Sequence, residues 1–265
     1  MSLRLPAHLG AVLERRHLVL FMAQRQRRQG LVGTALGQLW ELINPAAQVA
    51  IYYLLVAVIF QRGGTFESGA FLTLVIGIIH YSWMSHALTD AAGSILQQEG
   101  LLLQVRIEPL VFVFSSFMKS LLGFRGPLAV LAVVYALSDP DLAPRIVAYP
   151  ALLAALSLLV WAGGLVLASM SVFVRDLKFA LPIVLRLLMY ACPVIYTLDL
   201  VPPSVRDIYL LNPVATLFAL LQWSLLGEAL PSPGHIALAS VVIGVLAVAA
   251  YGTYARSQTR FTKVF

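Results

Sequence analysis

The chain has 265 residues, of which 60% are hydrophobic and 11% are charged, and its mean hydropathy is +0.87. A soluble domain carries about 25% charged residues, so this composition excludes a protein whose whole surface faces water. The net charge of +6 does not indicate a nucleic-acid partner, because the basic residues lie between long apolar runs, as in a membrane protein.

Helices, and not the strands of a β-barrel, are expected to cross the membrane. A transmembrane strand alternates apolar and polar residues over about ten positions. Residues 151–160 (ALLAALSLLV) show no such alternation. The predicted fold class is therefore all-α integral membrane, with residues 1–265 forming a single transmembrane domain.

The first thirty residues contain no long apolar core and no small-residue cleavage pattern, so no cleavable signal is expected. Residues 9–30 (LGAVLERRHLVLFMAQRQRRQG) place arginines between apolar residues at roughly helical spacing. This pattern predicts an amphipathic helix in the membrane interface, with its arginines toward the lipid phosphates.

Several segments reach the roughly 20 apolar residues that a helix needs to cross a bilayer core about 30 Å thick. We predict six spans, at residues 39–60, 71–90, 112–137, 147–173, 181–198 and 235–255. The chain shows no internal repeat, which argues against an inverted-repeat transporter. One small bundle favours a homodimer that encloses a pathway.

Basic residues are distributed unevenly about these spans. With the amino terminus inside, the cytoplasmic segments hold twelve Lys or Arg residues, six before the first span and six in later segments. The opposite side holds only Arg62, Arg145 and Arg206. The positive-inside rule then places both termini in the cytoplasm, and we expect a multi-pass protein of the bacterial inner membrane.

Residues 199–234 contain an apolar run, 214–230, between prolines. A seventh span here would place the basic carboxy-terminal tail outside, against the charge rule. We therefore predict a re-entrant helical hairpin in the outer leaflet. Irregular backbone at that depth is tolerated only where it is buried in protein or faces water, so the hairpin is expected near the mouth of a pathway.

No pattern indicates catalysis. The chain lacks a GxxxxGK[ST] loop and so has no phosphate-binding loop of its own. Its single cysteine, Cys192, excludes an intrachain disulfide, and its five histidines show no metal-binding spacing. We expect no catalytic residue, no metal and no cofactor in this chain.

Three basic residues fall inside predicted spans, namely Lys119, Arg125 and Arg186. No acidic residue lies deep in a span to pair with them, so they would suit an anionic passenger. Snorkelling to the interface is an equal alternative for Lys119 and Arg186. Arg125 lies about 9 Å deeper than Lys119 and is the strongest pathway candidate.

Aromatic residues in or near the spans add candidates for stacking on sugar rings. They also fit the aromatic belts found at both membrane interfaces, which is the default interpretation. The aromatic pathway candidates are Tyr52, Trp83, Trp161 and Tyr190.

Two segments on the cytoplasmic side could receive force from a soluble motor. They are residues 93–109 and the loop 174–178, which contains Arg175 and Asp176. The alternative for each is a solvated turn.

Four segments, in this order, carry a resemblance to a known family. They are residues 25–45 (RQRRQGLVGTALGQLWELINP), 99–109 (EGLLLQVRIEP), 173–185 (FVRDLKFALPIVL) and 192–214. Together they resemble the permeases of ABC exporters for capsular polysaccharide, O-antigen and teichoic acid. The likeness extends over nearly the whole chain and is greatest to the capsule-exporting permeases of Gram-negative bacteria.

The resemblance implies a second copy of this chain, two copies of a separate ATPase that binds ATP and Mg, and further periplasmic and outer-membrane partners. It implies a lipid-linked, acidic capsular polysaccharide as the substrate. It also implies a lateral gate at which Arg25, Arg27 and Arg28 lie near lipid phosphates, and contact of Glu99, Arg106 and Glu108 with the ATPase. Hydrolysis would open the dimer interface between the first and fifth spans.

Other functions remain open on sequence grounds. A permease for O-antigen, or for a small drug or lipid, would share the fold. A membrane enzyme would need acids or histidines clustered at one membrane face. A self-contained channel would work without an ATPase.

Overall fold

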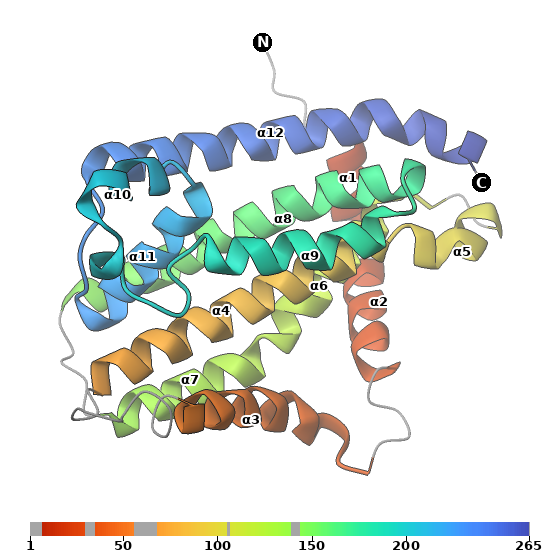
Figure 1. Cartoon of the computed structure of the whole chain (residues 1–265). Coiled ribbons are helices and arrows are strands. Elements are labelled where there is room, and N and C mark those ends of the chain that lie inside the picture. Colours follow the sequence, from red (N-terminus) through yellow and green to blue (C-terminus); the bar gives the residue numbers. More distant parts are fainter. Residues whose placement is uncertain (1–6, 30–34, 56–67, 105–106, 139–143, 265) are drawn as a thin grey trace.

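The computed structural model describes residues 7–29, 35–55, 68–104, 107–138 and 144–264 (Figure 1). This described part folds into helices and connecting turns and contains no strand. Arg106, predicted to contact the ATPase, lies outside the described residues, as does the end of the predicted first span. The α-helices in chain order are α1 Ala7–Glu14, α2 Arg16–Gln29, α3 Trp40–Leu55, α4 Ser68–Gly93, α5 Glu99–Gln104, α6 Leu110–Gly123, α7 Arg125–Leu137, α8 Tyr149–Phe173, α9 Leu177–Tyr190, α10 Pro203–Tyr209, α11 Pro213–Leu226 and α12 Pro233–Val264.

Four segments are long and apolar enough to cross a membrane, and they coincide with the second, third, fourth and sixth predicted spans. The helices α10 and α11 meet at 111° and would add a fifth if this bent pair is one broken span. The four segments are Phe71–Gly93, Leu110–Leu137, Pro144–Phe173 and Pro233–Gln258. These segments support a multi-pass protein, and the count of six spans stays a prediction.

The predicted fifth span, residues 181–198, has different bounds in the structure. Helix α9 begins at Leu177 and ends at Tyr190, and the chain then turns instead of continuing as a helix. The turn contains Pro193, which cannot donate a backbone hydrogen bond to a helix. With 14 residues, α9 is about 21 Å long, which is shorter than a bilayer core of about 30 Å.

The long helices run roughly side by side, and the two ends of this bundle differ in composition (Figure 1). At one end, α4, α8 and α12 finish, α6 and α9 begin, and α1, α2 and α5 are found. We call this the α2 end. At the other end lie α10 and the start of α12. The described amino-terminal helices and the end of α12 therefore lie at the same end of the bundle, and the assignment of this end to the cytoplasm stays a prediction.

The predicted interface helix at residues 9–30 is two helices, α1 and α2, separated at Arg15. Figure 1 shows α2 lying across the direction of the long helices. It packs against α6 and buries Val19, Met22 and Ala23. Its arginines are exposed or half-buried, so α2 has the amphipathic character that the sequence predicts; its position in a membrane stays a prediction.

Helix α11 is buried along most of its length among α4, α8 and α12. Asn212 caps its first turn, with the side-chain Oδ1 accepting from the Val214 N–H at 3.0 Å. Gly227 ends the helix with a φ of 79°, a left-handed conformation that favours glycine. Two helices, α10 and α11, lie within residues 199–234, and α11 is an internal element of the bundle. The re-entrant hairpin in the outer leaflet stays a prediction.

The turn that follows α9 is fixed to its neighbours. The Gln222 side chain donates to the carbonyl oxygens of Pro193 and Tyr196 at 2.7 and 3.1 Å. A Cβ at Gly77 of α4 would overlap the Val194 carbonyl, so the two backbones touch. This end of α9 is therefore held within the bundle, while most of its other residues are exposed.

Candidate functional site

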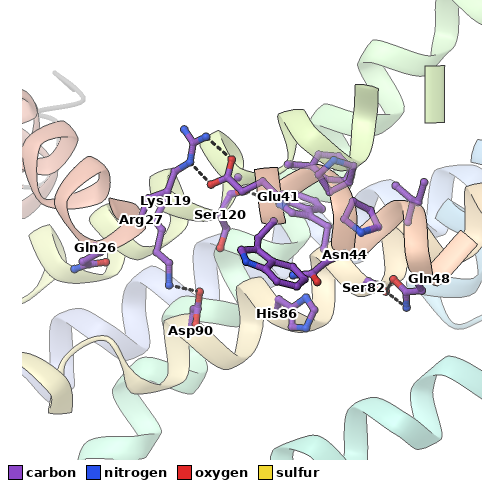
Figure 2. A pocket seen from close by; sticks show the side chains of 17 residues that line it. Gln26, Arg27, Glu41, Asn44, Gln48, Ser82, His86, Asp90, Lys119 and Ser120 are labelled. Atoms are coloured by element: carbon purple, nitrogen blue, oxygen red, sulfur yellow. Dashed lines mark hydrogen bonds and ion pairs between the residues drawn. The ribbon is translucent and has the colours of Figure 1, made fainter. Parts of the chain in front are cut away.

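The main cavity of interest, about 440 Å³ in volume, lies between α2, α3, α4, α6 and α7. It extends from the end of α2, the start of α3 and the second half of α4 to the break between α6 and α7 in the middle of the third predicted span. Figure 2 shows its polar side chains, which include Gln26, Arg27, Glu41, Asn44, Gln48, Ser82, His86, Asp90, Lys119 and Ser120.

An ion pair joins α2 to α3 at one side of this cavity. The Arg27 guanidinium donates from Nε and Nη2 to both carboxylate oxygens of Glu41, a two-point geometry that fixes both groups. The side chains are 27% and 19% exposed. The hydrogen bond that Arg27 donates to Glu41 raises the pKa of Arg27, and burial partly opposes this rise.

A second ion pair joins α6 to α4. Lys119 Nζ lies 2.8 Å from Asp90 Oδ2, and the two side chains are 32% and 38% exposed. The expectation that the basic residues inside spans lack acidic partners is therefore wrong for Lys119. The two residues meet because α4 and α6 are antiparallel neighbours, joined at the α2 end.

Aromatic rings form another part of the wall. Trp83 stacks on Phe124 with ring centroids 4.6 Å apart and 23° between the planes. Its indole N–H donates to the Ser120 carbonyl at 3.1 Å. Trp40, at the start of α3, lines the same cavity and is 38% exposed.

Uncharged polar groups complete the lining. The amide of Gln48 and the hydroxyl of Ser82 are hydrogen-bonded at 3.2 Å. Asn44 and His86 also line the cavity and are exposed, and Figure 2 places them between the two ion pairs and the Gln48–Ser82 pair. None of these four residues was singled out as a site residue by sequence; the available signal was their amide, hydroxyl and imidazole groups within otherwise apolar spans.

The backbone geometry around this cavity depends on a break in the third span. Helix α6 ends at Gly123, and α7 begins at Arg125 after Phe124. In the first turn of α7, a Cβ at Gly126 would overlap the Glu41 carbonyl oxygen. The start of α3 therefore rests on α7 while the Glu41 side chain reaches Arg27.

Of the predicted pathway residues, the structure brings only Lys119 and Trp83 to this cavity. Arg125 and Arg186 are exposed, on α7 and α9 respectively. Trp161 packs on Phe114 at 5.7 Å between ring centroids. The other two are also elsewhere: Tyr52 is half-buried against the core on α3, and Tyr190 is 57% exposed at the end of α9.

The three arginines predicted at a gate do not act as one group. Arg27 faces the main cavity and binds Glu41. Arg25 and Arg28 are exposed and line a separate depression of about 260 Å³ on α2, together with Phe21, Gln24 and Gln29. Two of the three arginines therefore remain exposed on that part of α2.

Two of the residues predicted to contact an ATPase lie around one hollow. Glu99 and Arg175 line a cavity of about 450 Å³ at the α2 end, together with Lys178 at the start of α9. Asp176 is exposed at the start of α9. Glu108 instead accepts a hydrogen bond from the Tyr254 hydroxyl of α12 at 2.7 Å.

The side chains that line the main cavity are suited to hydrogen bonding and stacking. Among the described residues, no group of three or more His, Cys, Asp or Glu side chains could hold a metal ion. The cavity offers amide, hydroxyl and imidazole groups, two indole rings and two internally neutralised ion pairs. These groups can hydrogen-bond and stack on a polar ligand.

Comparison with known proteins gives consistent matches along the chain. Residues 17–226 match the family described as ABC-2 type transporter. The chain is similar to the O-antigen export system permease protein RfbA of Myxococcus xanthus, with 25% identity over 250 residues that cover 94% of this chain and 95% of the relative. Two proteins of the same name from Klebsiella pneumoniae are 21% and 19% identical, covering 84% and 100% of this chain and 83% and 100% of the relatives.

Proposed function

Because this chain belongs to the ABC-2 type transporter family, we propose that it is the membrane subunit of an ATP-driven exporter that moves a lipid-linked polysaccharide across the inner membrane. The subunit is not itself an enzyme. Its ATP and Mg are bound by the separate ATPase with which a permease of this family pairs.

The observation that carries the proposal is likeness over almost the full length of both chains. The Myxococcus xanthus relative is named for O-antigen export and matches 94% of this chain and 95% of its own length. A match of this extent includes both the membrane helices and the segments between them. A common fold alone would not name a substrate, so the polysaccharide assignment depends on these relatives.

The geometry of the α2 end fits a lipid-linked substrate. Arg25 and Arg28 are exposed on an amphipathic helix that crosses the direction of the membrane helices. Exposed arginines on such a helix suit contact with lipid phosphates. The main cavity lies beside the same helix, lined by Gln26 and Arg27 of its last turns, so a glycan attached to that phosphate would have a polar site within reach.

The assembly that we propose contains two copies of this chain and two ATPase subunits, with periplasmic and outer-membrane partners completing the export route. Apolar side chains are exposed along α3, where Ile51 and Leu54 are 64% and 62% exposed, and along α9, where Ile183 and Leu187 are 64% and 65% exposed. These faces are available to a second copy. Both termini are cytoplasmic in this arrangement, and the hollow lined by Glu99 and Arg175 faces the ATPase.

Between the two polysaccharide classes, we favour O-antigen over the acidic capsular polymer to which the sequence resemblance first pointed. The three relatives are named for O-antigen export. Of the three cations that suggested an acidic passenger, Lys119 is neutralised by Asp90.

The deciding experiment is purification of this chain from native membranes after gentle solubilisation, followed by ATPase and transport assays in proteoliposomes. An ATPase subunit in equal number, with hydrolysis stimulated by lipid-linked O-antigen, is the expected result. Stimulation by acidic capsular polymer alone would assign the capsular class instead. A stable chain with no ATPase partner would contradict the proposal and favour a self-contained channel. Stimulation of hydrolysis only by small lipids or drugs would assign the substrate to that class instead of to polysaccharides.

A further inference from the structure

The charged groups of the main cavity cancel. Its lining contains the two basic residues Arg27 and Lys119 and the two acidic residues Glu41 and Asp90, and each base is paired with one acid. An anion entering this space would compete with the carboxylate already bound to each base, and Glu41 and Asp90 would repel it. The lining therefore favours an uncharged ligand over phosphate and carboxylate groups.

The uncharged lining has the features that a sugar ring needs. A pyranose presents apolar C–H faces and a rim of hydroxyl groups that both donate and accept hydrogen bonds. Trp40 and Trp83 supply aromatic surface, while Asn44, Gln48 and His86 supply donors and acceptors. The volume of about 440 Å³ lies within the range of roughly 300–1,000 Å³ found for small-molecule sites.

Some of these polar groups are available to a ligand. Within the described part of the chain, the side chains of Asn44 and His86 form no hydrogen bond, and both residues are exposed and line the cavity. Gln48 and Ser82 bind each other at 3.2 Å and keep further capacity, since an amide has two donors and two lone pairs.

We propose that this cavity binds an uncharged sugar ring of the exported polymer. The inference rests on the proposed function and deepens it. It separates two tasks on the two sides of α2: the exposed Arg25 and Arg28 serve the anionic lipid phosphate, while the neutralised cavity beside Arg27 holds the adjoining sugar.

The test uses the complex of this chain with its ATPase, reconstituted in nanodiscs, and follows intrinsic tryptophan fluorescence during titration. The neutral probes are the methyl glycosides of glucose, galactose, mannose and N-acetylglucosamine. The charged probes are methyl glucuronide, which differs from the glucoside by a carboxylate at C6, and inorganic pyrophosphate. At least one neutral glycoside should bind tenfold or more tightly than the glucuronide, and pyrophosphate should not compete. Equal or tighter binding of either anion, or no binding of any neutral glycoside, would overturn the proposal.

Substitutions of Trp40 test whether the neutral glycoside binds in the main cavity. Trp40→Ala should weaken binding of the neutral glycoside at least tenfold, because it removes an aromatic face at the edge of the cavity. Trp40→Phe should retain most of the affinity. Trp223→Phe, on α11 outside the cavity, is the matched control and should leave the affinity unchanged. Loss of affinity in the Trp223 variant but not in Trp40→Ala would place the sugar elsewhere.

Substitution of Asp90 tests the charge argument directly. Asp90→Asn keeps the size of the side chain but leaves Lys119 without its anion, so the cavity gains one positive charge. The ratio of glucuronide to glucoside affinity should rise at least tenfold. If Asp90→Asn fails to fold, Glu41→Gln is a second variant that also removes one negative charge from the cavity. An unchanged ratio in a folded variant would contradict the neutral-site proposal.

The two proposals fail in distinguishable ways. If the complex assembles and exports polysaccharide but binds no glycoside at this cavity, the sugar-site inference fails and the proposed function stands. If no ATPase partner is found, the proposed function fails, and glycoside binding can still be measured on the full chain alone.

Discussion

The hydroxyl of Tyr254 connects α12 to the segment that precedes α6. It donates to Glu108 Oε1 at 2.7 Å and accepts the backbone N–H of Leu110 at 2.9 Å. Tyr254 and Leu110 are fully buried. The carboxy-terminal helix is thereby attached to the same segment, residues 99–109, that is predicted to contact the ATPase.

Tyr254→Phe should destabilise the protein, because it leaves the buried Leu110 N–H without its acceptor. A loss of about 1–3 kcal/mol in the free energy of unfolding is expected, measured as a lower thermal unfolding midpoint in detergent. The matched control is Tyr251→Phe on the same helix, since the Tyr251 hydroxyl is buried without a partner in the described structure; its effect should stay within about 0.5 kcal/mol. Equal effects of the two variants would refute a role for the hydrogen bonds.

The Arg27–Glu41 pair should contribute measurably but modestly to holding α2 against α3. Both groups are partly exposed, so a double-mutant cycle with Arg27→Gln and Glu41→Gln is expected to give a coupling of about 0.2–1 kcal/mol. High salt should reduce this coupling. Pairing with Glu41 raises the pKa of Arg27. The ion pair therefore contributes fully to stability at every pH below the ordinary pKa of arginine, and this contribution is lost only as the pH rises above that pKa. Coupling should therefore stay constant between about pH 7 and pH 10, and a fall across that range would contradict this assignment.

Gly126→Ala should disturb the contact between α7 and α3, because the added methyl group would overlap the Glu41 carbonyl oxygen. Overpacking of this kind costs about 1–3 kcal/mol, and the thermal midpoint should fall accordingly. Gly244→Ala in α12 is the control, since a Cβ there meets nothing within 4 Å. A destabilised Gly244 variant with a normal Gly126 variant would show that the close approach of the two backbones is not required.

Double substitution of Arg25 and Arg28 by Gln should lower export severalfold while leaving the unfolding midpoint and the assembly with the ATPase unchanged. Both side chains are exposed and line only the shallow depression on α2, so their removal leaves no buried group unpaired. Export is measured in cells, and assembly by co-purification. Normal export in a properly assembled complex would exclude these two arginines from the handling of lipid phosphates.

Composition and charge distribution predict much of the fold, because a bilayer demands long apolar helices and orients them by their basic flanks. Four of the predicted spans correspond to long apolar helices. The end of α9 at Tyr190 was less predictable, because the residues around Pro193 are still apolar and the turn depends on contacts with Gln222 and Gly77. Hydropathy does not report such contacts.

The candidate site was less accessible from sequence than the fold. Lys119 and Trp83 were identified individually, but their cavity partners come from other helices. Asp90 lies 29 positions from Lys119 and Glu41 lies 14 positions from Arg27. Lys119 meets Asp90 because of the position at which α6 packs along α4, and Arg27 meets Glu41 because α2 approaches the start of α3. Both arrangements depend on tertiary packing. Opposite charges near the joined ends of neighbouring antiparallel spans were the signal available.

The attachment of α9 at one end has a mechanical consequence. Its end at Tyr190 leads into a turn held by Gln222 and seated on Gly77, while at the opposite end Phe179 and Ile183 are 67% and 64% exposed. Between these ends, Leu181 and Leu185 pack beside Ala92 of α4, and the Leu185 carbonyl accepts a hydrogen bond from the Tyr81 hydroxyl. We expect a helix held by a fixed turn at one end and by packing along one face to tilt about the fixed turn more easily than it slides along its axis. Over a helix about 21 Å long, a tilt of a few degrees moves the residues beside Arg175 by one or two ångströms while the anchored turn stays in place. Force applied near the loop at 174–176 would thus become an angular motion of α9 with its pivot on the opposite side of the bundle.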